Sequence, residues 1–227
     1  MKIGILQTGH APDELLRDRG DYDAHFQRLL DGHGFTFETY NVVDMSFPES
    51  VTQCDGWLVT GSKHGAYEDH PFIPPLEDFI REAYEARIPM VGICFGHQII
   101  AQALGGHVEK FAGGWSVGRR EYDWNGEVIA LNAWHQDQVI RRPEGAKVLA
   151  ANDFCENAAL VYEDRIFTVQ PHPEFDSTFI EGLAIHRGPG VVPENQLQEV
   201  VANLDRPVNN NQLAAKIARF FKERTVA

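Results

Sequence analysis

Cys94 lies between two glycines, in a G-x-C-x-G pattern that covers residues 92–96. An apolar stretch, residues 89–93, precedes the cysteine, and a helix-compatible stretch, residues 98–104, follows it. This order predicts a strand, a sharp turn and a helix, which is the arrangement of a nucleophile elbow with sulfur in place of a serine hydroxyl. At the start of a helix, free backbone N–H groups and the positive end of the dipole favour a thiolate. The alternative interpretation is a buried structural cysteine, the usual state of a free thiol.

A nucleophilic cysteine needs a general base and a group that orients this base. Among ten histidines, His172 has the most informative context, because it follows an apolar stretch at residues 166–170 and precedes Glu174 by two positions. Side chains at i and i+2 of an extended segment point the same way, so Glu174 can hold the imidazole as the third member of a triad. The prolines on both sides of His172 stiffen this segment. The alternative is a surface histidine beside a glutamate. The order Cys, His, Glu differs from the order of an α/β-hydrolase, nucleophile, acid, histidine, and disfavours that fold.

The elements that must position these residues follow the order of an α/β protein. Strands are expected at residues 2–7, 35–43, 56–60 and 89–93, and helices at residues 21–30, 74–86 and 98–104. Such an order predicts a parallel sheet with helices on both faces. Ligands of these sheets bind at the carboxyl ends of the strands, so loops 8–11, 61–69 and 94–98 are candidate binding loops.

The chain after residue 106 changes in character. Short β-like stretches lie at residues 107–111, 116–122, 127–131, 138–140, 148–151, 158–162 and 165–170. The pair Asn125-Gly126 is a strong hairpin signal, so an antiparallel or mixed extension of the sheet is expected. Three helical stretches follow, at about 175–186, 193–204 and 209–224. With no linker or repeat, the sequence predicts one domain over residues 1–227, with a C-terminal helical extension at about 177–227.

The composition excludes several classes of protein. A net charge of −13 over 227 residues argues against nucleic acid or an anionic membrane surface as the main partner, because either needs a basic patch. No apolar run approaches the ~20 residues of a membrane span. The three cysteines, Cys54, Cys94 and Cys155, form no C-x-x-C pair and predict neither a zinc knuckle nor a disulfide framework, so a cytoplasmic location fits best. Cys54 and Cys155 lack the glycine pattern and are interpreted as structural.

Four segments together resemble the class I glutamine amidotransferase family of the triad type. The segment 92–98 is similar to its nucleophile elbow, and Gln170-Pro171-His172-Pro173-Glu174 is similar to its histidine and glutamate segment. Val59-Thr60-Gly61-Ser62 resembles its oxyanion loop, and residues 134–139 resemble an S-H-x-D-x-V segment that borders the glutamine pocket. Trp134 stands where serine is common. The resemblance covers about residues 40–176.

The resemblance implies a flavodoxin-like α/β fold and acyl chemistry at a γ-glutamyl carbonyl. Cys94 is then the nucleophile, His172 and Glu174 complete the triad, and the backbone N–H groups of Gly61 and Phe95 stabilise the oxyanion. Gln98, His135 and Asp137 are implied to bind the substrate; the alternatives are a helix-surface glutamine for Gln98 and a polar turn for the other two. Thioester chemistry needs no metal or other cofactor, and no metal-ligand cluster is evident, because His97, His107 and His135 are widely spaced.

Three functions remain open on the sequence. The first is hydrolysis of the γ-glutamyl amide of glutamine, with ammonia passed to a separate synthetase subunit, since the chain has no P-loop of its own. The second is a γ-glutamyl peptidase or hydrolase that takes γ-glutamyl peptides or amides, because residues 60–69 resemble stand-alone members. The third is a non-catalytic regulatory subunit, which the complete Cys94, His172 and Glu174 set disfavours. A small-molecule substrate is the expected partner in the first two.

Overall fold

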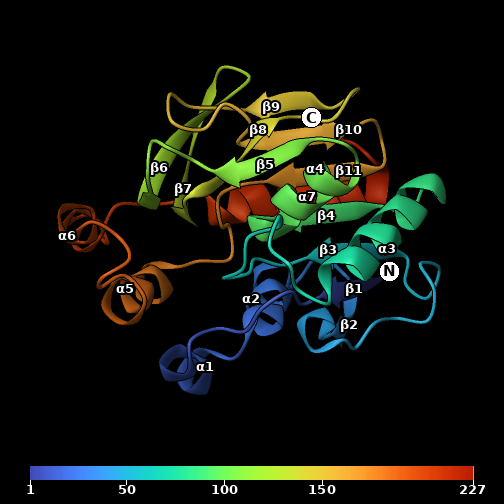
Figure 1. The fold of residues 1–227 in the computed structure, drawn as a ribbon, viewed down its shortest axis with the longest axis horizontal. Helices are drawn as coiled ribbons and strands as arrows, with labels where there is room; N and C mark the ends of the chain where they lie inside the picture. The colour runs from blue at the N-terminus through green and yellow to red at the C-terminus, as the bar shows by residue number, and fades with distance from the viewer. Residues whose placement is uncertain (227) are drawn as a thin grey trace.

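The computed structural model describes residues 1–226, and its centre is a seven-stranded sheet in the order β2-β1-β3-β4-β11-β10-β9 (Figure 1). The neighbours from β2 to β11 pair in parallel, whereas β10 pairs antiparallel with both β11 and β9. The predicted α/β class with a mixed, mostly parallel sheet is therefore confirmed. The strands are β1 (Lys2–Leu6), β2 (Thr36–Tyr40), β3 (Gly56–Val59), β4 (Met90–Ile93), β9 (Lys147–Ala150), β10 (Ala159–Tyr162) and β11 (Ile166–Val169).

Two antiparallel strand pairs form separate two-stranded sheets. β5 (His107–Lys110) pairs with β8 (Asp137–Arg141), and β6 (Ser116–Trp124) pairs with β7 (Glu127–His135). The predicted turn at Asn125-Gly126 joins β6 to β7, and both residues have positive φ, as a tight hairpin requires. Of the strands after residue 106, β9, β10 and β11 join the central sheet, whereas β5 to β8 form the two separate pairs. The expectation of antiparallel strands is thus correct, but most of them pair among themselves.

Helices cover both faces of the central sheet. α3 (Ile73–Glu85) and α4 (Phe95–Ala103) pack on one face, where Trp57 and Val59 of β3 belong to the same buried cluster as these helices. α2 (Tyr22–Leu29) and α7 (Asn210–Glu223) pack on the other face with Leu58. Successive residues of β3 point to opposite faces, and all of them are buried because both faces are covered.

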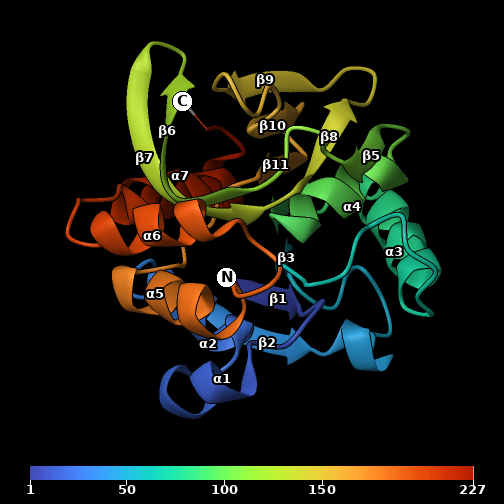
Figure 2. The same cartoon turned by 60° about the vertical axis from the view of Figure 1, so that its left-hand side comes forward.

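A third buried cluster lies beside the sheet. It joins α5 (Ser177–His186) and α6 (Glu194–Ala202) to α1 (Asp13–Arg19) and the start of α2 through Phe179, Leu183 and their neighbours (Figure 2). α1 was not predicted from the sequence, because this helix buries none of its own residues and so shows no apolar periodicity. The predicted strand at residues 35–43 ends at Tyr40, and a 3-10 turn, η1 (Val42–Asp44), follows. Among residues 1–226, no helix has the length and apolar character that crossing a membrane requires.

Candidate active site

Cys94 occupies a strained turn directly between β4 and α4. Its φ of 54° and ψ of −103° are unusual for a residue with a side chain. Two backbone hydrogen bonds hold the turn: the Cys94 N–H donates to the Val169 carbonyl (2.9 Å), and the Gly96 N–H donates to the Thr60 carbonyl (3.1 Å). A Cβ on Gly92 would lie 2.6 Å from the Gly96 oxygen, and one on Gly96 would lie 2.3 Å from the Val59 oxygen. Both glycines of the pattern are therefore required by close backbone approach. Because α4 begins at Phe95 rather than at the expected residue 98, Cys94 directly precedes the helix.

The sheet order brings His172 to Cys94. β11 lies beside β4 in parallel register, with Val169 opposite Ile93, so the segments that leave the two strands start at the same edge. The other neighbour of β4 is β3, which places Gly61 at this edge as well. A Cβ on Gly61 would lie 2.9 Å from the His172 Cε1 and 3.8 Å from the Cys94 Cβ. Three of the predicted residues thus meet at one point.

Three contacts fix the His172 imidazole. Its Nδ1 lies 2.6 Å from Oε1 of Glu174, and its ring stacks on Phe175 with centroids 3.9 Å apart and an interplanar angle of 5°. The His172 N–H donates to the Asn132 carbonyl (2.8 Å). His172 is 4% exposed and Glu174 is 7% exposed. The contact predicted between His172 and Glu174 is present, whereas the supporting ring of Phe175 was not predicted from the sequence.

The charges around His172 favour its protonated form. Burial lowers the pKa of His172, but the Glu174 carboxylate and the Cys94 sulfur outweigh this effect and raise the pKa to about 10. A nearby carboxylate and sulfur stabilise the imidazolium form, which is the form that can donate a proton to a leaving group. The arrangement is therefore electrostatically suited to an imidazolium at His172, beside the Cys94 sulfur.

Gln170, for which the sequence predicted no role, also contacts Cys94. Its Nε2 lies 3.6 Å from the Cys94 Sγ, and its Oε1 accepts a hydrogen bond from Gln98 Nε2 (3.2 Å). Gln98 Nε2 also donates to the Asp137 carbonyl (2.9 Å). The amide of Gln98 is thus engaged with the protein and ties α4 to β8 and to the segment after β11. The sequence feature that could have identified Gln170 is its position directly before Pro171 and His172.

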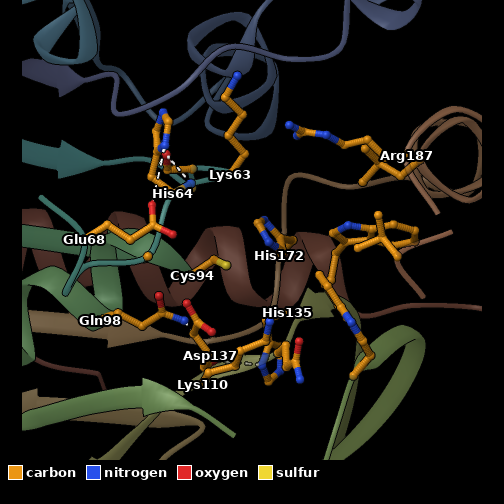
Figure 3. A pocket seen from close by; sticks show the side chains of 18 of the residues that line it. Lys63, His64, Glu68, Cys94, Gln98, Lys110, His135, Asp137, His172 and Arg187 are labelled. Atoms are coloured by element: carbon orange, nitrogen blue, oxygen red, sulfur yellow. Dashed lines mark hydrogen bonds and ion pairs between the residues drawn. The ribbon is translucent and has the colours of Figure 1, made fainter. Parts of the chain in front are cut away.

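A cavity of about 410 Å³ opens over Cys94. Its wall includes Gly61, Gln98, His135, Asp137 and His172, whereas Glu174 and Phe95 are not part of the wall. Figure 3 shows Cys94 and His172 in the middle of the site, with Lys63 and Arg187 on one side and the residues His135, Asp137 and Lys110 on the other. The predicted binding residues therefore share one cavity with the predicted nucleophile.

Burial shifts the pKa values of His135 and Asp137 in opposite directions, and in both cases it favours the uncharged form. The Asp137 carbonyl accepts a hydrogen bond from His135 Nδ1 (3.2 Å), which leaves Nε2 of His135 as a buried acceptor without a partner among residues 1–226. Burial, with a smaller contribution from His172, lowers the pKa of His135 to about 3, so this ring is neutral. Burial raises the pKa of the Asp137 carboxyl, which accepts a hydrogen bond from the Tyr67 hydroxyl (3.2 Å). Trp134, where serine is common, also lines the cavity.

The other two cysteines do not line this cavity. Cys54 and Cys155 are both buried. Burial raises the pKa of the Cys54 thiol, and it raises the pKa of the Cys155 thiol to about 12. Neither environment favours a thiolate.

Comparison with known proteins places this chain in a family. The model of class I glutamine amidotransferases matches residues 22–185, which is more than half of the chain. A glutamine amidotransferase-like protein of Schizosaccharomyces pombe is 32% identical over 97% of this chain and 98% of its own length. The chain belongs to the class I glutamine amidotransferase family.

Two further comparisons concern a relative named as a peptidase and a solved structure. Gamma-glutamyl peptidase 4 of Arabidopsis thaliana is 29% identical over 90% of this chain and 88% of its own length. The crystal structure of a glutamine amidotransferase from Thermotoga maritima superposes with a TM-score of 0.75 at 20% identity, covering 99% of this chain and 98% of that chain. The fold is therefore that of the family over its whole described length.

Proposed function

We propose that this chain hydrolyses the γ-glutamyl amide of glutamine through a γ-glutamyl thioester on Cys94. The observation that carries the proposal is the meeting of Cys94, His172 and Glu174 at the carboxyl ends of adjacent strands, with 2.6 Å between His172 Nδ1 and Glu174 Oε1. Such a set contains the nucleophile, base and orienting group of covalent acyl transfer.

The proposed reaction has two stages. The Cys94 thiolate attacks the side-chain amide carbon of glutamine, and the C–N bond breaks as His172 donates a proton to the departing ammonia. His172, now neutral, then takes a proton from water, which attacks the thioester and releases glutamate and the thiol. Glu174 keeps the imidazole in its orientation throughout.

The oxyanion that forms in both stages needs backbone donors. We propose the Phe95 N–H, at the start of α4, and the Gly61 N–H from the loop after β3. The Gly61 carbonyl accepts a hydrogen bond from the Thr60 hydroxyl (3.0 Å), so the Ser62 N–H, on the opposite side of that peptide, is an alternative donor from the same loop. Loss of one such donor typically lowers the rate by about 10²- to 10³-fold.

The cavity offers groups of the right charge for an amino acid. We propose that Asp137 and Glu68, both in the wall, attract the α-ammonium group, and that the free Nε2 of His135 accepts a hydrogen bond from the substrate. Gln98 acts by holding the Asp137 backbone in place. These roles use polar groups of a wall that also contains aromatic and apolar side chains.

A second candidate function is hydrolysis of γ-glutamyl peptides, and three cations favour it. Lys63, Lys110 and Arg187 line the cavity, yet none of them forms a side-chain hydrogen bond or ion pair with another residue in the range 1–226. Cations without a hydrogen-bonded or ion-paired partner among these residues, in a chain of net charge −13, favour anionic ligand groups, although Lys110 also acts on the Asp137 carboxylate through its charge. Glutamine carries one carboxylate, whereas a γ-glutamyl peptide adds a second on its leaving group. The cavity, at about 410 Å³, is within the range of sites that hold ligands larger than a single amino acid.

A substrate panel tests both functions. Purified protein is incubated with glutamine and with γ-glutamyl dipeptides, and released ammonia and glutamate are measured. Hydrolysis should fall by at least about 10⁴-fold in Cys94→Ala and stay unchanged in the matched Cys54→Ala variant. If neither substrate class reacts and no glutamine-like electrophile labels Cys94, the catalytic proposal fails and the non-catalytic regulatory role takes its place.

The same assay tests the proposed synthetase subunit. If ammonia release from glutamine appears only after a cellular extract is added, the protein works with a separate synthetase. If purified protein reaches full activity alone, it is a free-standing hydrolase.

A further inference from the structure

Three side chains of the kind that bind metal ions lie together at the edge of the cavity, where none was expected from the sequence. His64, Glu68 and His70 offer ligand atoms that all lie within 4.8 Å of one another. His64 Nδ1 is 3.8 Å from Glu68 Oε2, and His70 Nε2 is 2.8 Å from the same oxygen. Ligand atoms around a four-coordinate zinc ion lie about 3.4 Å apart. Small side-chain movements therefore suffice to surround an ion.

The loop holds these three residues close together before any ion binds. The Glu68 N–H donates to the Gly65 carbonyl (3.1 Å), and the His70 N–H donates to the Glu68 carbonyl (3.1 Å). The two imidazole rings have centroids 4.0 Å apart, and the His70 ring stacks on Phe72 at 5.9 Å and 19°. Phe72 is itself buried. A preformed ligand set loses less conformational entropy on binding than a flexible one.

The chemistry of the donors selects the kind of ion. Two imidazole nitrogens with one carboxylate oxygen suit zinc and its transition-metal neighbours, whereas calcium and magnesium prefer oxygen ligands alone. We propose that His64, Glu68 and His70 bind a divalent transition-metal ion of the zinc class at the edge of the catalytic cavity. The three side chains are partly exposed, at 20%, 46% and 31%, so an ion reaches them from solvent, and water completes the coordination.

Binding of this ion has a consequence for the cavity. His64 and Glu68 both line it, and Figure 3 shows them side by side at its edge, whereas His70 is not part of the wall. Coordination neutralises the Glu68 carboxylate and holds it at the edge. If Glu68 attracts the substrate ammonium group, as the proposed function has it, the ion weakens substrate binding and acts as a reversible inhibitor that raises KM more than it lowers kcat.

The binding test does not depend on activity. Co²⁺ absorbance and Zn²⁺ calorimetry are measured on the full chain carrying Cys94→Ala, which removes the catalytic thiol as a competing ligand. One ion should bind, without a thiolate-to-metal charge-transfer band. Affinity should fall by at least about 100-fold in His64→Gln and in His70→Gln, each checked for folding by circular dichroism. His107→Gln is the matched control, because His107 and Glu109 form an exposed pair at 3.2 Å and belong to no group of three ligand atoms among residues 1–226.

Three results would overturn the proposal. The first is unchanged affinity in both histidine variants, and the second is loss of ion binding in Cys94→Ala alone. The third is equal loss in His107→Gln. In the otherwise native chain, Zn²⁺ should raise KM, and His70→Gln should retain hydrolysis but lose this inhibition. A protein inactive on every substrate would refute the proposed function and leave the binding test valid.

Discussion

Glu174 is enclosed, yet only one of its carboxylate oxygens has a partner. Oε1 faces His172, whereas Oε2 is buried with no hydrogen-bond partner among residues 1–226. A buried carboxylate is costly unless a charge compensates it, so Glu174 and the imidazolium form of His172 stabilise each other. At the scale of single residues, the protonation of His172 therefore depends on Glu174.

Replacing Glu174 by glutamine tests this dependence. Burial then acts on His172 with less compensation, so the pKa of His172 falls from about 10. The protonated imidazole is lost at a lower pH, and the alkaline limb of the profile of kcat/KM should move to lower pH, with kcat reduced by about 10²- to 10⁴-fold. Glu156→Gln, at an exposed glutamate, is the control. An alkaline limb that stays in place in Glu174→Gln would show that Glu174 does not set the pKa of His172.

At the scale of elements, the turn between β4 and α4 depends on glycine at two positions. Gly96→Ala places a Cβ 2.3 Å from the Val59 carbonyl oxygen, which belongs to the neighbouring strand and cannot move away freely. We expect this substitution to lower the free energy of unfolding by about 3 kcal/mol. Gly105→Ala is the control. Gly105 has a φ of +91°, but a Cβ added there would meet no atom within 4 Å beyond its chain neighbours, so only backbone strain of about 1 kcal/mol applies. Chemical denaturation of both variants measures the difference, and equal values would contradict a packing cause.

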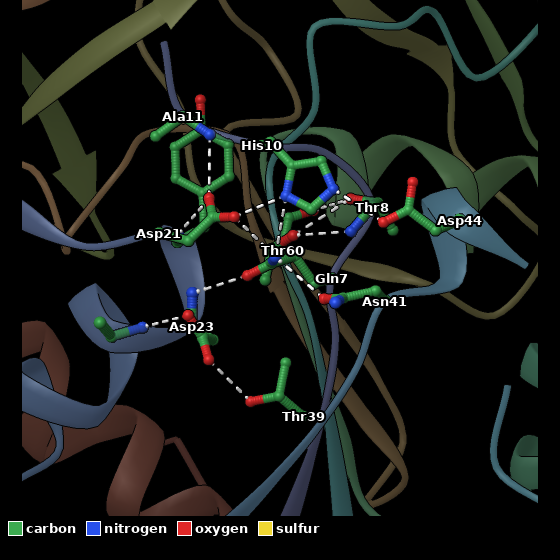
Figure 4. Close-up of polar contacts among 12 residues, drawn as sticks. Gln7, Thr8, His10, Ala11, Asp21, Asp23, Thr39, Asn41, Asp44 and Thr60 are labelled. Carbon is green, nitrogen blue, oxygen red and sulfur yellow. Dashed lines mark hydrogen bonds and ion pairs between the residues drawn. The ribbon is translucent and has the colours of Figure 1, made fainter. Parts of the chain in front are cut away.

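His10, in the loop after β1, contacts the start of α2 and the end of η1 (Figure 4). Its Nδ1 lies 2.5 Å from Asp21, the N-cap of α2, and its Nε2 lies 3.0 Å from Asp44 in η1. Burial lowers the pKa of His10, but the hydrogen bonds to Asp21 and Asp44 outweigh it and raise the pKa above 6.5. Both nitrogens can donate only when the ring is protonated.

The raised pKa of His10 predicts a pH-dependent contribution to stability. A folded-state pKa above the unfolded value means that the stabilisation is fully present below pH 6.5 and is lost as the pH rises through the folded pKa. Because the His10 side chain is 42% exposed, solvent screening limits the effect to less than about 1 kcal/mol. Denaturation of wild type and His10→Gln should therefore differ at acidic pH and converge at alkaline pH. A difference that grows with pH would contradict the assignment.

At the scale of the whole molecule, the C-terminal helix closes the core that the N-terminal strands begin. The ring centroid of Phe220 in α7 lies 5.8 Å from that of Phe167 in β11. The ring centroid of Phe221 lies 5.8 Å from that of Phe35, which directly precedes β2. α5 and α6 share their buried cluster with residues of α2. These contacts favour the proposal that residues 1–227 form one domain rather than a core with a loose extension.

Cooperative unfolding tests that proposal. The four tryptophans report on all three buried clusters: Trp57 on the α3 and α4 face, Trp124 on the α7 face, and Trp115 and Trp134 beside α5 and α6. Variants that retain one reporting site should give coincident guanidinium transitions, which also coincide with far-UV circular dichroism. An earlier transition at Trp115 and Trp134 would show that the helical extension unfolds separately.

The sequence determined the features that depend on neighbouring residues. The glycine spacing around Cys94 predicted the turn, Asn125-Gly126 predicted the hairpin, and the separation of strands by helices predicted the mixed, mostly parallel sheet. Each of these follows from local sterics or periodicity, which a single stretch of chain carries by itself. Family membership followed from the same short segments.

Only the tertiary structure decided which distant side chains meet. The order of β3, β4 and β11 in the sheet placed Gly61, Cys94 and His172 together and brought Gln170 to the sulfur. It also showed that Lys63, Lys110 and Arg187 surround one cavity. The turns of residues 64–70 gathered His64, Glu68 and His70, although their spacing carries no regular period. Within residues 64–70 the local turns decide these distances. The other distances depend on the packing of elements that are remote in sequence, which local patterns do not specify.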